Sequence, residues 1–171
     1  MKSKGIAIAI ASVLIASFSV TSSHAATKNP YGDSAVDPAP ANAVILTLSK
    51  GAKSTTYTFS QLKAMKSKTI SIYEPFVKVR QSFTVIPLAD LFKKVSISGK
   101  DMVQTIALND YIYSNTAADF TGASGYLAIA RNGKVIPYNQ GGPIRIVFPD
   151  GSKWSKFLDP WNWSLNKLVV K

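Results

Sequence analysis

Apolar and polar residues alternate in several stretches of the chain, which is the pattern of strands that bury one face. Turn-forming residues separate most of these stretches from one another. Residues 125–138 are expected to form a β-hairpin, because Asn132-Gly133 suits a tight type I′ turn. The other expected strands cover residues 43–49, 69–74, 77–85, 102–113, 144–149 and 165–171.

Two short helices are expected between the strands. Ser60 should cap the first, which holds Leu62 and Met65. Pro87 stands at the first turn of the second, where apolar residues recur at i, i+3 and i+4. Residues 114–124 are expected to be a loop with one helical turn. Many strands, few helices and no βαβ alternation predict a single α+β domain with a mixed or antiparallel sheet.

The first residues have the pattern of an export signal. Lys2 and Lys4 precede an apolar run, and small residues, Ser23 and Ala25, occupy the −3 and −1 positions of a cleavage site. We interpret residues 1–25 as a secretory signal peptide, with a retained membrane anchor as the alternative. The prediction that follows is a periplasmic or secreted protein.

Two further parts follow this signal peptide. Residues 26–42 are rich in Ala, Pro, Asp and Asn without periodicity, and we expect a flexible linker there. Residues 43–171 should form the folded domain. The 146 residues left after cleavage of the 171 are enough for one hydrophobic core and too few to expect two.

Cleavage would also change the available chemistry. The only histidine, His24, would leave with the signal peptide, and the chain has no cysteine. These absences exclude Ser-His-Asp and Cys-His nucleophiles, zinc sites built from Cys and His, and disulfides. Loss of Lys2 and Lys4 lowers the formal net charge from +11 to +9. That charge attracts anions, acidic partners or lipid headgroups, or serves only solubility, whereas nucleic acid is not an expected partner of an exported chain without a recognition motif.

Three segments place polar or aromatic residues where strands end. The first contains Asn109, Asp110 and Tyr111 after a buried strand. A carboxylate there can accept two N–H groups of a planar heterocycle at once, which sets both its position and its orientation. The alternative is that Asn109 and Asp110 only form an Asx-turn.

The second segment joins polar groups to glycines. Tyr138, Asn139 and Gln140 precede a pair of glycines that includes Gly142, and Arg145 follows in the next strand. Glycine lets the backbone approach a ligand closely, and a guanidinium binds a phosphate or carboxylate or stacks on a ring. The alternative is a long turn followed by a surface arginine.

The third segment, residues 154–165, holds all three tryptophans. Pro160 breaks any helix, so Trp161 and Trp163 are expected to lie in an extended stretch and to point the same way. Two aromatic rings on one face can hold a flat ring between them. The alternative is that they close one end of the core.

In their order along the chain, four segments resemble the molybdopterin-binding oxidoreductase domain, which is the fold of sulfite oxidase. The resemblance covers about residues 60–171 and implies that fold for the domain. The four segments are VIPLADLFKKV at 85–95, VQTIALNDY at 103–111, the block at 126–149 that contains GGPIRIVFP, and the tryptophan segment that leads to LNKLVVK.

One departure from the family affects the expected function. Its enzymes bind molybdenum through a cysteine that precedes the Pro-Leu helix, and residues 70–85 contain none. A molybdenum centre held by a protein thiolate is therefore not expected. Cations for the cofactor phosphate are also few, since the arginines are Arg80, Arg131 and Arg145 alone.

The resemblance implies that the pterin-binding part of the scaffold remains. Asp110 would accept hydrogen bonds from the 2-amino and N3 groups of a pterin ring. Aromatic residues that could sandwich the ring are Tyr111, Tyr138, Trp161 and Trp163. No covalently bound cofactor is expected; a pterin is the expected ligand, and molybdopterin is the alternative.

Short exported family members without the cysteine resemble periplasmic pterin-binding proteins that report to a membrane signalling protein. The expected function is therefore that of a non-catalytic sensor or carrier with a pterin and such a protein as partners. One alternative is a molybdopterin-dependent oxidoreductase whose metal is held by the dithiolene alone or by a ligand other than cysteine, such as Tyr73. Tyr73 and Arg80 are also among the expected ligand-binding residues. The other is a ligand-free adaptor domain.

Overall fold

The computed structural model describes residues 40–171, which form nine strands and three short α-helices. Each α-helix follows a pair of strands along the chain. The expected signal peptide at residues 1–25 and most of the expected linker at 26–42 lie outside the described residues. In this part of the chain no helix is both long and apolar enough to cross a membrane.

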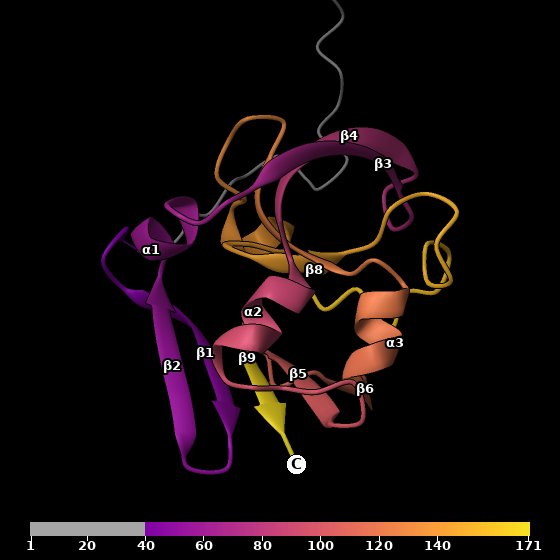
Figure 1. The fold of residues 1–171 in the computed structure, drawn as a ribbon. Coiled ribbons are helices and arrows are strands. Elements are labelled where there is room, and N and C mark those ends of the chain that lie inside the picture. Colours follow the sequence, from indigo (N-terminus) through magenta and orange to yellow (C-terminus); the bar gives the residue numbers. More distant parts are fainter. Residues whose placement is uncertain (1–39) are drawn as a thin grey trace, which may run out of the picture.

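The first sheet is mixed and contains five strands in the order β2-β1-β9-β5-β6. The central pair, β1 and β9, is parallel, and the other pairs are antiparallel. Figure 1 shows β1 and β2 on one side of β9 and β5 and β6 on the other. The bounds are β1 Val44–Lys50, β2 Lys53–Thr58, β5 Met102–Ala107, β6 Ile112–Thr116 and β9 Leu165–Val170.

The second sheet is antiparallel and contains four strands in the order β3-β4-β7-β8. Its long β3–β4 hairpin arches over the top of the molecule in Figure 1. The turn of that hairpin covers residues 75–78 and carries Phe76, which lines a cleft. The bounds are β3 Lys68–Glu74, β4 Val79–Pro87, β7 Tyr126–Arg131 and β8 Arg145–Val147.

Both sheets contribute to one hydrophobic core. Leu46 and Leu48 of β1, Phe83 and Val85 of β4 and Leu168 of β9 are fully buried in it. Complete burial of a side chain of this kind stabilises a fold by about 1.5–3 kcal/mol. The alternation read from the sequence at residues 43–49 thus reflects the side chains that face this core.

The helices are short and begin at defined residues. α1 (Phe59–Lys63) begins after Thr58, whose hydroxyl accepts from the Gln61 N–H while the Gln61 side chain accepts from the Thr58 N–H. The expectation that Ser60 caps this helix is therefore wrong, because the capping box is completed two residues earlier. α2 (Leu88–Lys94) is present, but Pro87, expected in its first turn, is its N-cap and the last residue of β4. α3 (Ala117–Gly122) packs beside α2 (Figure 1).

Three further segments differ from the sequence-based expectation. Residues 102–113 do not form one strand; they belong to a hairpin of β5 and β6 whose turn covers residues 108–111. Residues 53–58, for which no strand was expected, form the edge strand β2. At the Asn132-Gly133 turn both residues have positive φ, as a type I′ turn requires, but the returning chain forms only the bridge between Arg131 and Lys134. The α+β class with mixed and antiparallel sheets is confirmed.

Candidate functional site

Three turns from different parts of the fold meet around a cleft of about 320 Å³. We call it the first cleft. The three turns are the β3–β4 turn, the β5–β6 turn and the irregular segment that precedes β9. Four of the seven lining residues are aromatic, so the wall offers flat apolar faces with a few polar groups. The lining residues are Phe76, Asn109, Tyr111, Leu158, Asp159, Trp161 and Trp163.

A second cleft of about 450 Å³ lies on the other side of two shared residues, Asn109 and Trp163. Backbone hydrogen bonds hold its walls together at Ser164, whose N–H donates to the Gly141 carbonyl at 3.0 Å. The Ser164 carbonyl accepts from the Leu108 N–H at 2.9 Å. The lining residues are Leu108, Asn109, Tyr138, Asn139, Gly141, Trp163 and Ser164.

The Trp163 ring is held from several sides. The Phe76 ring packs against it with 4.7 Å between the ring centres. The Arg145 guanidinium carbon lies 4.2 Å from the Trp163 ring centre, a distance suited to a cation–π interaction. A Cβ atom on Gly141 would lie 2.8 Å from the same ring, and Gly141 has a φ of +85°. Glycine at 141 is therefore needed for this ring to pack where it does.

A buried ion pair lies beneath this ring. Arg145 donates to Glu74 at 2.8 Å, and both side chains are 0% exposed. The other carboxylate oxygen of Glu74 accepts from the Val77 N–H at 2.8 Å, which ties the pair to the turn that carries Phe76. Arg145 belongs to the lining of neither cleft, and its charge is matched inside the protein. It lies against Trp163, which lines both clefts.

The β5–β6 turn positions Tyr111 and Asn109. The Asn109 side chain accepts from the Tyr111 N–H at 3.4 Å, and Asp110 adopts a φ of +63°. This is the Asx-type turn that the sequence left open as an alternative, with exposed Asp110 at its tip. The Tyr111 hydroxyl donates to the Asp159 carbonyl oxygen at 3.1 Å. Burial raises the pKa of Tyr111, with smaller contributions from Asp159 and Tyr113, so the phenol stays protonated at neutral pH.

The tryptophans do not share one face of an extended strand. Residues 158–164 form successive turns, so the two-residue period of a strand does not apply to them. Trp161 is only 1% exposed, and its indole N–H donates to the Trp154 carbonyl at 2.8 Å. It closes the end of the core and reaches the lining of the first cleft, whereas Trp163 separates the two clefts.

Half of the residues predicted for binding line one or both clefts. These are Asn109, Tyr111, Tyr138, Asn139, Trp161 and Trp163. The other half lie outside both linings: Tyr73, Arg80, Asp110, Gln140, Gly142 and Arg145. Their roles in ligand binding stay predictions, and the structure gives each of them a position.

Four of these residues contact other parts of the fold through a side chain or the backbone. The Arg131 guanidinium donates to the Gln140 side chain, which is buried. Tyr73 and Arg80 face each other across β3 and β4, and both donate to Asp150, through the Tyr73 N–H at 2.8 Å and the Arg80 guanidinium at 2.7 Å. A Cβ on Gly142 would lie 1.8 Å from the Ile136 carbonyl oxygen, so the close approach at Gly142 is to the protein's own backbone.

Sequence reasoning missed several lining residues. Phe76 and Leu158 lie in turns and carry no periodic signal, and Asp159 was not singled out. The available signal was local: Phe76 is an aromatic residue directly after Pro75, and Asp159 directly precedes Pro160 between tryptophans. Exposed aromatic residues in turns are unusual enough to be considered as contacts for a ligand.

The residues present do not suit a molybdenum centre bound through protein sulfur. The chain has no cysteine, and residues 40–171 contain no group of three or more His, Cys, Asp or Glu side chains that could hold a metal. No Lys or Arg is among the residues that line the two clefts, so the described clefts also offer no cation to a cofactor phosphate. The same clefts do offer aromatic faces to a flat ring.

Comparisons with known proteins agree with this picture of the fold. The oxidoreductase molybdopterin binding domain family matches residues 74–166, a range that includes every residue lining the two clefts. A search of curated proteins finds no match.

Among solved structures, the crystal structure of the sulfane dehydrogenase SoxCD from Paracoccus pantotrophus is similar, with a TM-score of 0.61 at 12% identity. The similar region covers 84% of this chain and 46% of that one, so this chain spans less than half of the SoxCD chain. At this identity the likeness shows the fold. Together with the family match over more than half of the residues, it leads to the conclusion that this chain belongs to the oxidoreductase molybdopterin binding domain family.

Proposed function

We propose that this chain is an exported protein that binds a pterin without transforming it, and that it senses or carries the pterin for a membrane signalling protein. The observation that carries the proposal is the aromatic first cleft at Trp163 in a family member that has no cysteine. The cleft has walls for a flat ring, and the chain has no thiolate to hold a catalytic metal.

The dimensions and chemistry of the first cleft support a small heterocycle. Its volume of about 320 Å³ is at the lower end of the range for small-molecule sites. Phe76, Tyr111 and Trp163 provide aromatic faces, and Asn109 and Asp159 provide hydrogen-bonding groups at its margin. A ring with several N–H donors would use both kinds of contact.

Exposed apolar side chains around the cleft support a protein partner. Phe157 is 64% exposed, and Leu158, Leu108 and Tyr111 are 46%, 48% and 42% exposed. Apolar side chains gathered on one surface are typical of places where a second protein docks. A signalling partner that covers this rim would detect whether the cleft is filled.

The decisive experiment combines elemental analysis with calorimetric titration of a pterin, using one preparation of the purified protein. Micromolar or tighter pterin binding without molybdenum would support the proposal. About one molybdenum atom per chain would instead favour a molybdopterin-dependent oxidoreductase, which family membership makes the second candidate. Absence of both would leave the exposed rim as the surface of an adaptor domain and would contradict the proposal.

A further inference from the structure

The first cleft has an acidic margin. Asp159 is among its lining residues, and the exposed Asp110 lies in the turn that also carries Asn109 and Tyr111. Neither cleft has a Lys or an Arg in its lining. Asp159 is therefore the only charged residue in the first cleft's lining; outside it, Asp110 lies in the β5–β6 turn and Lys78 lies in the β3–β4 turn.

The ion pairs of the molecule make these two carboxylates distinct. Residues 40–171 contain seven Asp and Glu side chains. Glu74 is paired inside the core with Arg145, and four Asp side chains are paired with surface cations. Asp110 and Asp159 therefore remain outside the ion pairs of the described residues. The surface pairs are Lys50–Asp101, Arg80–Asp150, Lys93–Asp90 and Lys153–Asp119.

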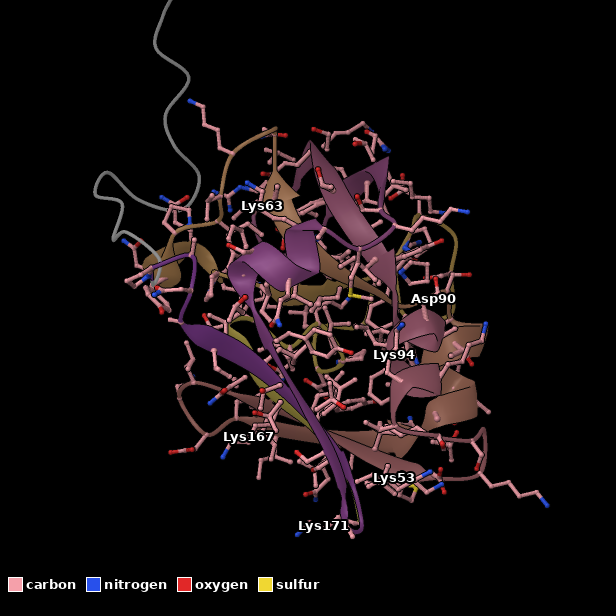
Figure 2. The ribbon with its side chains drawn as sticks, turned by 60° about the vertical axis from the view of Figure 1, so that its left-hand side comes forward. Lys53, Lys63, Asp90, Lys94, Lys167 and Lys171 are labelled. Atoms are coloured by element: carbon pink, nitrogen blue, oxygen red, sulfur yellow. The ribbon has the colours of Figure 1, made fainter. Side chains whose placement is uncertain are left out.

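No cation of the described residues is part of the first cleft's lining. Figure 2 shows exposed lysines of β2, α1, α2 and β9, namely Lys53, Lys63, Lys94 and Lys167. Arg145 is the guanidinium nearest the aromatic wall, but it is buried against Trp163 and paired with Glu74 at 2.8 Å. A negatively charged group on a ligand in the first cleft would thus face the Asp159 carboxylate without a cation in the lining.

We infer that the first cleft selects a flat heterocycle that is neutral or positively charged, that donates N–H groups to Asp159, and that carries no phosphate. This inference rests on the proposed function and adds the charge class of its ligand. A carboxylate accepts two N–H donors well, and the exposed Asp159 carboxylate repels a phosphate dianion at close range. Molybdopterin carries a phosphate, so the same reasoning separates this cleft from a molybdopterin site.

The test compares 6-hydroxymethylpterin with its phosphate ester by isothermal titration calorimetry at low ionic strength. Because the two probes share the ring, the ratio of their affinities reports the effect of the phosphate. We expect the unphosphorylated compound to bind at least about tenfold more tightly, a difference of about 1.4 kcal/mol, because the phosphate ester is repelled by Asp159. Added salt should reduce the ratio, because it screens the repulsion.

Two variants assign the effect to a residue. Asp159→Asn should weaken binding of 6-hydroxymethylpterin and strengthen binding of the phosphate ester, so that the ratio falls several-fold. Lys156→Ala is the matched control, because Lys156 is exposed and close in sequence to Asp159 but is not part of either lining. We expect it to leave the ratio within about twofold of the wild-type value.

The outcomes distinguish this inference from the proposed function. Equal binding of the two compounds, or tighter binding of the phosphate ester, would overturn the inference and leave the pterin-binding function standing. A ratio that Asp159→Asn does not change would also overturn it. If neither compound binds, the proposed function fails and the inference fails with it.

Discussion

Trp163 is the residue at which most features of the site meet. It separates the two clefts, packs against Phe76, covers Arg145 and leaves no room for a side chain at residue 141. Its position therefore depends on three residues, Phe76, Gly141 and Arg145, which come from two other segments of the chain. A side chain held in this way is pre-organised, so little conformational freedom is lost when a ring stacks on it.

We expect Trp163→Ala to reduce pterin affinity by roughly 5- to 150-fold, because stacking of a base on an aromatic side chain is worth about 1–3 kcal/mol. Calorimetric titration measures the loss directly. Phe157→Ala is the control, since Phe157 is 64% exposed and lines neither cleft. Equal losses in the two variants would contradict a specific role for Trp163.

The buried pair of Glu74 and Arg145 leads to a prediction about stability. Glu74→Gln would leave the Arg145 charge inside the core without its carboxylate, so we expect the free energy of unfolding to fall by about 3–5 kcal/mol. Urea denaturation followed by circular dichroism measures this change. Lys93→Ala removes the exposed pair with Asp90 and should cost about 1 kcal/mol or less. A loss of similar size in both variants would show that burial of the Glu74–Arg145 pair has no special effect.

At the scale of elements, the site depends on turns whose shape the surrounding backbone determines. The short helical turn Tyr138–Gln140 is followed by two glycines, and each contacts a different part of the protein. Gly141 packs against the Trp163 ring, and Gly142 packs against the carbonyl of Ile136. The long polar stretch before β8 therefore builds the wall of the second cleft and brings Arg145 under Trp163.

Two glycine substitutions test this interpretation. Gly142→Ala would place a Cβ 1.8 Å from the Ile136 carbonyl oxygen, so we expect a destabilisation of several kcal/mol or failure to fold. Gly122→Ala is the matched control at the end of α3, where a Cβ would meet nothing within 4 Å. This control should be neutral or stabilising by up to about 1 kcal/mol. Thermal denaturation of both variants provides the comparison, and a well-folded Gly142→Ala protein would contradict the packing described here.

At the scale of the whole molecule, surface charge affects stability as well as binding. Hydrogen bonds from Lys50 lower the pKa of Asp101, and those from Lys153 lower the pKa of Asp119. The backbone N–H of Tyr73, together with Arg80, lowers the pKa of Asp150. In each case the folded protein favours the ionised carboxylate more than the unfolded chain does.

These shifts predict the direction of the pH dependence. Because the pKa values of these carboxyls are lower in the folded state, the folded state binds fewer protons than the unfolded chain. The stabilisation that the three ionised carboxylates give is fully present above about pH 4, the pKa of Asp in an unfolded chain. It is lost as the pH falls through the lower pKa values of the folded protein. We therefore expect the melting temperature to decline as the pH is lowered below about 4.

Thermal scans between pH 7 and pH 2.5 measure this dependence. Asp150→Asn should have a lower melting temperature than the wild type at pH 7. The two melting temperatures should approach each other in acid, where Asp150 of the wild type is protonated in the folded and unfolded states. A difference from the wild type that stays constant over the whole range would contradict the assignment to Asp150.

The sequence by itself determined the features that depend on neighbouring residues. Alternation at residues 43–49 marked β1, and the proline-led apolar repeat marked α2, because side-chain period follows directly from backbone geometry. A strand was also expected at residues 165–171, where β9 lies. The missing cysteine excluded a thiolate-held metal without any coordinates. The family resemblance, carried by the order of several motifs, also came from the sequence and is confirmed.

Only the tertiary structure decided which distant residues meet. Arg145 has the pattern of a ligand-binding arginine, but its partner, Glu74, is 71 positions away and belongs to a different strand. Phe76 and Asp159 reach the first cleft because three turns converge there, and no local pattern predicts such a meeting. Gly142 is required by a carbonyl from the preceding turn. Local patterns specify strands and turns, whereas long-range packing specifies which side chains share a cavity and which charges are neutralised inside the protein.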